Sequence, residues 1–214
     1  MESTFANFSI TGIFYNSKNY KFRSCLNIRR INNNSDQPDL MVIMMNPGSS
    51  KPISDIYDVE TPAIPDMTQS RIIEIMNRCD FNYARVLNLS DIREPKSAVF
   101  YKMIAKLEEE NIPHSIFCDE RKEDFITYFV HNIPVIFAWG VHSKLAGLSK
   151  KAIDTIAPEN IFGYHKTNGI HCNTYYHPLR RSLAMQTEWI NKVSLLIKNK
   201  SAAQSNISNL LSNV

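Results

Sequence analysis

Cysteine is sparse in this sequence, and the few cysteines are widely spread. Cys25, Cys79, Cys118 and Cys172 follow one another at intervals of about 40 to 55 residues, and no two form a Cys-x-x-Cys pair. This spacing argues against a zinc ribbon, and it lacks the local chelate that a cysteine-ligated iron–sulfur cluster needs. We therefore expect free and mostly buried thiols.

Long apolar runs are missing as well. No stretch of about 18 apolar residues occurs, and residues 1–7 lack a basic region followed by an apolar block. We expect neither a membrane span nor a secretory signal, and hence a cytoplasmic protein. The formal net charge of +3 permits binding to a polyanion without requiring it.

The sequence also lacks the short motifs of several common enzyme classes. There is no Gly-x-Ser-x-Gly nucleophile turn, no Gly-x4-Gly-Lys-Ser/Thr phosphate loop and no His-Glu-x-x-His zinc motif. His165, His171 and Cys172 are close in sequence, but this trio lacks a fourth ligand and a recognisable spacing. We predict no metal and no cofactor.

What is present is enough apolar sequence for one substantial core. The chain has 214 residues, of which 43% are hydrophobic, and this length fits one large domain better than two small ones. We predict a single domain over residues 1–200. Its N-terminal extension, residues 1–38, contains extended strands or a hairpin followed by a polar loop. Residues 201–214 form a polar tail that is either a short helix or frayed.

Short apolar segments alternate with helical patterns along the domain. Residues 40–45, 84–89 and 135–139 resemble strands covered on both faces, and residues 172–176 form a fourth short strand. Helix-face spacing of apolar residues marks 68–79, 97–111, 120–131 and 182–199. The alternation predicts an α/β fold, a three-layer α/β/α sandwich with a central, mostly parallel four-stranded sheet.

In sheets of this kind, ligands bind beyond the carboxyl ends of the strands. That rule draws attention to residues 46–48, 88–91 and 140–143, which follow the three predicted core strands. The loop over residues 49–65 has several prolines and little periodicity, and such long loops beside a site are commonly functional.

Four segments in this order resemble the uracil-DNA glycosylase superfamily. They are Met-Met-Asn-Pro-Gly at 44–48, Val-Leu-Asn at 86–88, Phe-Ala-Trp-Gly-Val-His at 137–142 and Tyr-His-Pro-Leu at 176–179. The first is similar to the asparagine form of the water-activating motif in the mismatch-specific uracil/thymine branch. The second and third resemble the base-reading strand and a tryptophan-glycine core strand, and the fourth resembles the His-Pro-Ser loop that presses on the DNA minor groove. A small bacterial family of unassigned function shares the same pattern.

The resemblance implies a role for each of several residues. Asn46 would orient a water molecule through its side-chain carbonyl, although an amide is a poor general base. Asn88 would read the edge of a flipped pyrimidine, with Pro47 and Gly48 beside it in the base pocket. His177 would donate a hydrogen bond to the base O2 as charge develops there.

Other residues suit contacts with DNA. Lys51, Arg180 and Arg181 are candidates for phosphate binding. Leu179, or else Leu183 four residues later, is a candidate wedge in the base stack. The usual Ser-Pro after His-Pro is replaced here by Leu179 and Arg180. We interpret His142, which follows the Trp-Gly turn, as structural.

The leading interpretation is a monofunctional DNA glycosylase whose partner is DNA, with no membrane and no obligatory protein partner. Gly48 occupies the place at which strict uracil enzymes of this superfamily carry a tyrosine that blocks the pyrimidine C5, so the resemblance extends the substrates from uracil to 5-modified pyrimidines. We include hypermodified cytosine in phage DNA among the predicted substrates, which would give the protein a role in antiviral defence. The alternative is a noncatalytic nucleic-acid- or nucleotide-binding protein with the same fold.

Overall fold

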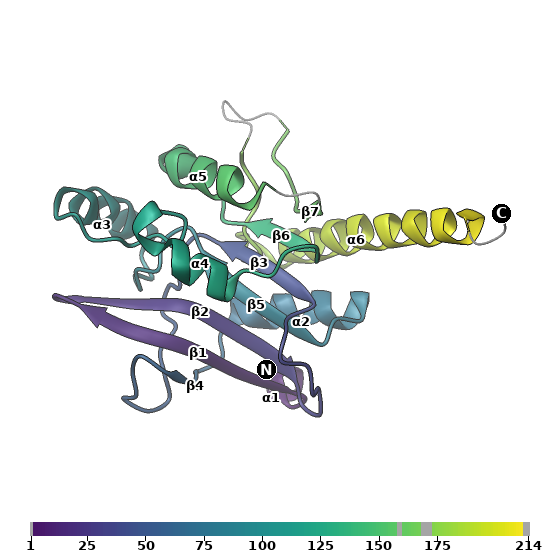
Figure 1. The fold of residues 1–214 in the computed structure, drawn as a ribbon, viewed down its shortest axis with the longest axis horizontal. Coiled ribbons are helices and arrows are strands. Elements are labelled where there is room, and N and C mark those ends of the chain that lie inside the picture. The colour runs from purple at the N-terminus through teal and green to yellow at the C-terminus, as the bar shows by residue number, and fades with distance from the viewer. Residues whose placement is uncertain (1, 158–159, 168–172, 212–214) are drawn as a thin grey trace.

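The protein is described here by a computed structural model, which covers residues 2–157, 160–167 and 173–211. Within this part of the chain, seven strands form one sheet in the order β4-β1-β2-β5-β3-β6-β7 (Figure 1). The strands are β1 (Phe8–Ser17), β2 (Tyr20–Arg30), β3 (Leu40–Met44), β4 (Glu60–Pro62), β5 (Tyr83–Asn88), β6 (Val135–Ala138) and β7 (Ile161–Phe162).

The sheet is parallel on one side and antiparallel on the other. β5, β3, β6 and β7 pair in parallel, whereas β2 pairs antiparallel with β5, and β1 pairs antiparallel with both β2 and β4. The predicted α/β class is confirmed. The predicted sheet of four mostly parallel strands does not hold as stated, because the N-terminal hairpin is no extension: it continues the sheet through the pairing of β2 with β5.

Helices pack on both faces of the sheet (Figure 1). The helices are α1 (Glu2–Phe5), α2 (Met67–Cys79), α3 (Ser97–Glu109), α4 (Lys122–Tyr128), α5 (Ala146–Ile156) and α6 (Leu183–Leu211). α2 and α6 bury apolar side chains such as Ile72 and Trp189 in one core cluster, and α3, α4 and α5 bury residues such as Phe100 and Phe125 in the other. Among the described residues, no helix is long and apolar enough to cross a membrane.

The predicted helices at 68–79 and 97–111 are confirmed with small changes at their ends. The predicted helix at 120–131 is shorter, since α4 ends at Tyr128 and a 3-10 turn at Asp119–Arg121 precedes it. α6 begins at Leu183 and passes the predicted tail boundary at residue 200 to reach Leu211. The side chain of Trp189 ties α6 to the preceding segment, because its Nε1 donates to the carbonyl of Tyr176 at 2.8 Å.

The fourth parallel strand is not where the sequence placed it. β7 lies at Ile161–Phe162, whereas residues 173–176 form only isolated bridges, in which Tyr175 faces Gly140 and His165. Cys172, the first residue of the predicted strand, lies outside the described residues. Of the other cysteines, Cys25 is a buried free thiol, and Cys79 and Cys118 are free and half-buried.

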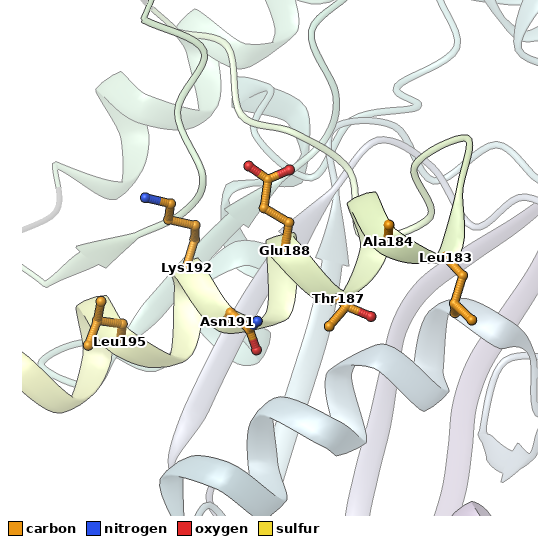
Figure 2. Close-up of a pocket in the computed structure, with 7 residues that line it drawn as sticks. All are labelled: Leu183, Ala184, Thr187, Glu188, Asn191, Lys192 and Leu195. Carbon is orange, nitrogen blue, oxygen red and sulfur yellow. The ribbon is translucent and has the colours of Figure 1, made fainter.

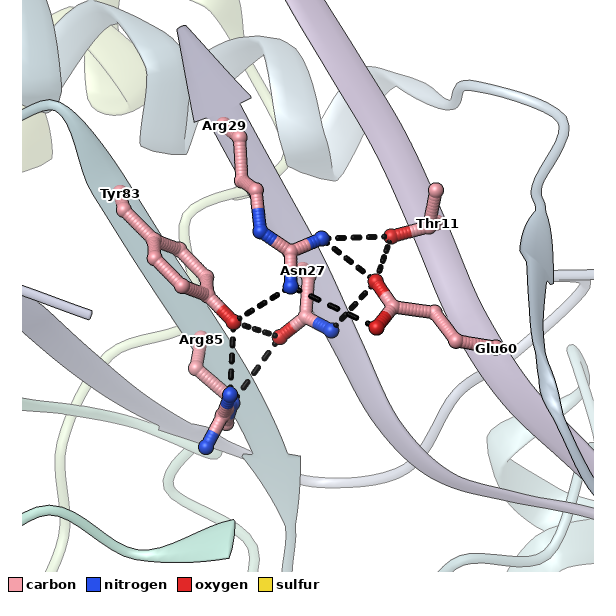
Figure 3. A network of polar contacts seen from close by, with 6 residues as sticks. All are labelled: Thr11, Asn27, Arg29, Glu60, Tyr83 and Arg85. Atoms are coloured by element: carbon pink, nitrogen blue, oxygen red, sulfur yellow. Dashed lines mark hydrogen bonds and ion pairs between the residues drawn. The ribbon is translucent and has the colours of Figure 1, made fainter. Parts of the chain in front are cut away.

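A polar network fastens β4 to the rest of the sheet (Figure 3). Glu60 of β4 accepts hydrogen bonds from Arg29 and from Asn27 Nδ2, the latter at 2.9 Å, and Asn27 Oδ1 accepts from the Tyr83 hydroxyl at 2.9 Å. Burial alone would raise the pKa of Glu60, but the hydrogen bonds from its partners outweigh it and hold the pKa at about 2. The predicted loop at 49–65 is therefore anchored near its end by a short strand.

Candidate functional site

A cavity of about 390 Å³ opens at the carboxyl ends of β3 and β5. Five residues predicted for the site line it: Asn46, Pro47, Gly48, His177 and Leu179. The other lining residues include members of β2, β5 and α2, among them Arg23, Leu26, Asp66, Gln69, Ile72 and Val86. Its size lies in the range of small-molecule sites, roughly 300 to 1,000 Å³.

The amide of Asn46 is held in one orientation. Asn46 lies two residues after the end of β3. Its Nδ2 donates to the carbonyl oxygens of Ile92 at 3.1 Å and Glu94 at 2.8 Å. Two carbonyl acceptors fix the NH₂ group on that side, which leaves Oδ1 as the part of the amide that accepts. This arrangement suits a residue that orients a water molecule through its carbonyl.

Asn88 is the last residue of β5 and pairs with Met44 in the sheet. Its side chain is 0% exposed, and neither Nδ2 nor Oδ1 has a hydrogen-bond partner among the described residues. Alternation along β5 places it on the same face as Val86, which lines the cavity. The prediction that Asn88 lines the base pocket needs correction: it lies beside the cavity, with its hydrogen-bonding groups unused.

The ring of His177 is neutral and its tautomer is defined by one hydrogen bond. Nδ1 accepts from the backbone N–H of Leu179 at 3.1 Å, so the proton of the neutral ring resides on Nε2. Burial lowers the pKa of His177 from 6.5 to about 4. His177 thus offers a neutral N–H donor at the cavity.

Gly48 lies in a turn in which the N–H of Ser50 donates to the carbonyl of Pro47 at 3.1 Å. Its φ of +61° is a left-handed conformation that glycine adopts without strain. A Cβ atom built at Gly48 would meet nothing within 4 Å. The cavity is therefore open at this position.

The candidate DNA contacts divide into two groups. Lys51 and Arg181 are exposed, and Leu179 is 37% exposed at the cavity edge. Arg180 differs from expectation, because its guanidinium pairs with Glu188 at 3.0 Å and lies over the ring of Tyr176 at 4.1 Å. Because its guanidinium is occupied by these contacts within the fold, Arg180 is not available to bind a phosphate.

His142 is structural, as predicted. Its Nδ1 accepts from the N–H of Lys144 at 3.2 Å and caps the 3-10 helix at Ser143–Leu145, and its ring stacks on Tyr101 with centroids 4.3 Å apart. The third strand-end segment, 140–143, therefore contributes no residue to the cavity wall.

A second buried polar group lies near the end of β5 but outside the cavity. Asp91 pairs with Arg121 at 2.8 Å, and both contact the hydroxyl of Tyr15. Burial raises the pKa of Asp91 to about 7 against the opposing effect of Arg121. We interpret these three residues as structural, because they join the hairpin to the segment before α4.

A shallow groove of about 650 Å³ runs along α6 (Figure 2). All its lining residues come from this one helix, at positions from Leu183 to Leu195. Glu188, its main polar group, already accepts from Tyr164 and pairs with Arg180. No second element supplies a converging group, so the groove is a poor candidate for chemistry.

No cluster of three or more His, Cys, Asp or Glu side chains suited to a metal occurs in the part of the chain that the structure describes. Two members of the sequence trio, His171 and Cys172, lie outside that part.

Most of the other residues of the cavity wall, among them Arg23 and Gln69, were not identified by sequence reasoning. Arg23 carries no distinctive local signal, because the segment around it mixes aromatic, apolar and basic residues. Gln69 carries the signature of a capping box with Asp66, three residues before it, which indicates a helix start and not a ligand site.

Fold and cavity together define an α/β protein with a largely apolar pocket that carries several polar side chains at the carboxyl ends of its parallel strands. Residues 26–179, more than half of the chain, match the family described as "Protein of unknown function (DUF1643)", and the chain belongs to this family. Asn46, Asn88 and His177 all lie within the matched residues. No curated protein and no solved structure matches the chain.

Proposed function

We propose that the protein is a DNA glycosylase that hydrolyses the N-glycosidic bond of a flipped-out uracil or 5-modified pyrimidine. The observation that carries this proposal is the pairing of Asn46 and His177 in one cavity. One presents a fixed carbonyl acceptor, and the other presents a neutral N–H donor. A reaction that needs both an oriented water and a donor to a leaving base is served by this pair.

The chemistry requires that the nucleotide leaves the base stack, because its reacting carbon is inaccessible inside the duplex. Water held by the Asn46 carbonyl attacks the sugar C1′, and the glycosidic bond breaks with its electron pair passing to the base. His177 Nε2–H donates to the base O2 as negative charge builds there. The water loses a proton to solvent, and the base takes one from solvent. Turnover is slow, because an amide is a weak general base.

Asn88 has the donors and the acceptor to pair with a pyrimidine edge. A buried amide without partners is costly, about 1 to 3 kcal/mol, and a bound base would satisfy it. Since Asn88 lies beside the cavity, this contact requires a neighbouring side chain to move when the base enters.

The proposal includes the assignment of the fold to the uracil-DNA glycosylase type. β5, β3, β6 and β7 form a parallel unit with helices on both faces; Asn88 ends β5, and Asn46 lies two residues after the end of the neighbouring β3. This arrangement supports a uracil-DNA glycosylase-like domain to which the hairpin and β4 have been added.

Gly48 supports a substrate with a group on the pyrimidine C5. The position is open, and no ring closes it. We therefore include hypermodified cytosines, of the kind carried by some phage genomes, among the substrates, and with them a role in antiviral defence.

A second candidate is a noncatalytic nucleic-acid- or nucleotide-binding protein. It is favoured by the amide at position 46, where a carboxylate would be the stronger base. Incubation with oligonucleotides that carry a panel of bases, followed by alkali to cleave abasic sites, separates the two: strand cleavage supports the glycosylase, and binding without cleavage supports the second candidate.

A further inference from the structure

Arg23 reaches the cavity because of an irregularity in the hairpin. Ile13 of β1 faces Cys25 of β2, but Phe14 faces Arg23, so Ser24 is an extra residue in β2. Regular alternation would turn Arg23 to the same face as Cys25. The bulge turns it instead to the face of Phe14, where it lines the cavity. β-Bulges next to active sites commonly redirect a side chain in this way.

The guanidinium of Arg23 has no partner within the described chain. The residue is 4% exposed, its Nε has no hydrogen-bond acceptor, and it forms no ion pair. Burial lowers the pKa of Arg23 to about 10, with Asp66 as the main opposing influence. A buried cation without a hydrogen-bonded counter-charge is expensive, so the fold holds Arg23 there at a cost in stability.

Gln69 adds a second unused donor to the same cavity. Its Oε1 accepts from the N–H of Asp66 at 3.1 Å, which fixes the amide, and its Nε2 is buried without a partner. Gln69 itself is 3% exposed. Asp66 forms no hydrogen bond or ion pair with either of these donors in the described chain; its Oδ1 accepts from the N–H groups of Thr68 and Gln69 at the start of α2.

The surroundings of Arg23 favour negative charge. The start of α2, a helix of 13 residues, forms part of the same wall and carries the positive end of its dipole. Arg93 is close enough to oppose the charge of Arg23, and its own Nε donates to the carbonyl of Ser50. The carboxylate of Asp66 also lines this wall and partly offsets the charge of Arg23. The unpaired donors, the helix start and the second cation together still favour an anionic ligand.

We propose that Arg23 and Gln69 form a subsite for an anionic oxygen group, a carboxylate or a phosphate, in the cavity that holds Asn46 and His177. The inference rests on the proposed function in that this cavity is the base pocket, and it narrows the substrate to one with a negative charge. The charge belongs either to a substituent of the base or to the phosphate of a nucleotide.

Binding measurements on the full chain test the subsite without any use of base release. Calorimetry compares 5-carboxyuracil with uracil, and deoxyuridine monophosphate with deoxyuridine. We expect at least one anion to bind about 10- to 100-fold tighter than its neutral counterpart, the effect of a charge-assisted hydrogen bond. A preference confined to the carboxyl base assigns the subsite to a base substituent, and one confined to the nucleotide assigns it to a phosphate.

Two variants and a control connect this preference to the residues. Arg23→Met removes the cation, and Gln69→Glu keeps the capping acceptor while it places a carboxylate beside Arg23. Both should reduce the preference to less than about twofold, and both should melt at or above the temperature of the wild type, because each relieves an unpaired buried charge. Arg30→Gln, at the far end of β2, should leave the preference unchanged.

The subsite is wrong if neither anion binds more tightly than its neutral counterpart, if no probe binds, or if both variants keep the preference. Base release from neutral substrates together with any of these results would refute the subsite and leave the glycosylase proposal standing. Anion binding without base release would support the subsite and refute the glycosylase proposal.

Discussion

Nδ1 of His177 accepts a hydrogen bond from the backbone N–H of Leu179 at 3.1 Å. This one contact determines which ring nitrogen carries the proton and so which end of the imidazole can donate to a ligand. It also depends on the neutral state, because a protonated Nδ1 would have no lone pair for the Leu179 N–H.

The first prediction concerns pH. Burial lowers the pKa of His177 from 6.5 to about 4, so base release should be constant from about pH 8 to pH 5 and should fall as the ring protonates near pH 4. A pH–rate profile of kcat/KM measures this. A loss of activity centred near pH 6.5 would contradict the lowered pKa of the His177 imidazole.

The same shift affects stability. In the unfolded chain His177 takes up a proton near pH 6.5, whereas in the folded chain it stays neutral down to about pH 4. Between pH 6.5 and pH 4 the unfolded state therefore binds more protons, and the free energy of unfolding decreases as the pH falls. In His177→Gln the melting temperature should fall less over this window than in the wild type. Some slope remains, because burial lowers the pKa of His114 to about 4 as well.

The second prediction concerns Asn88. Both polar atoms of its side chain are buried without partners, so Asn88→Leu should leave the free energy of unfolding within about 1 kcal/mol of the wild type or raise it. Base release should be lost. Urea denaturation and the glycosylase assay measure the two effects. A marked destabilisation would instead identify Asn88 as a structural residue.

The strands that carry the site were accessible to sequence reasoning. β3 is a continuous apolar run, β5 is apolar apart from Arg85, and polar residues follow both, so the rule for strand ends selects Asn46 and Asn88. The pairing of β2 with β5 was not accessible, because a local pattern does not state which strand lies beside which. β7 has two residues, too few for any period to show.

Arg23 shows a different limit. Strand alternation predicts its face from its neighbours, and the single extra residue at Ser24 inverts that prediction. Arg180 shows the opposite error: its position after the His-Pro turn suggested phosphate contact, and only the folded chain brings Glu188 and Tyr176 against it.

The third prediction concerns Gly48 and substrate size. Gly48→Tyr should exclude DNA bases with large C5 groups, such as 5-hydroxymethylcytosine and its glucosylated form, while release of uracil persists. Gly48→Ala is the matched control, because it has the same left-handed backbone cost of about 1 to 2 kcal/mol without the ring. Large bases processed equally by Gly48→Tyr and Gly48→Ala would disprove the open pocket.

The fourth prediction separates the two neighbouring arginines. Arg181→Ala should weaken binding to all DNA sequences alike and reduce the salt slope by about 1, as expected for one lost phosphate contact. Lys51→Ala should act in the same way. Arg180→Ala should instead lower the melting temperature, because its guanidinium pairs with Glu188 inside the fold. A lower salt slope in Arg180→Ala without a change in melting temperature would restore Arg180 to the DNA contacts.

The central claim is that Asn46 directs water at a glycosidic bond in this cavity. The most direct measurement is mass-spectrometric detection of free base after incubation of wild type and Asn46→Ala with oligonucleotides that carry uracil and 5-substituted pyrimidines. We expect free base from the wild type and none above background from Asn46→Ala, with DNA binding retained in both. No free base from the wild type on any substrate, or equal release by both proteins, would contradict it.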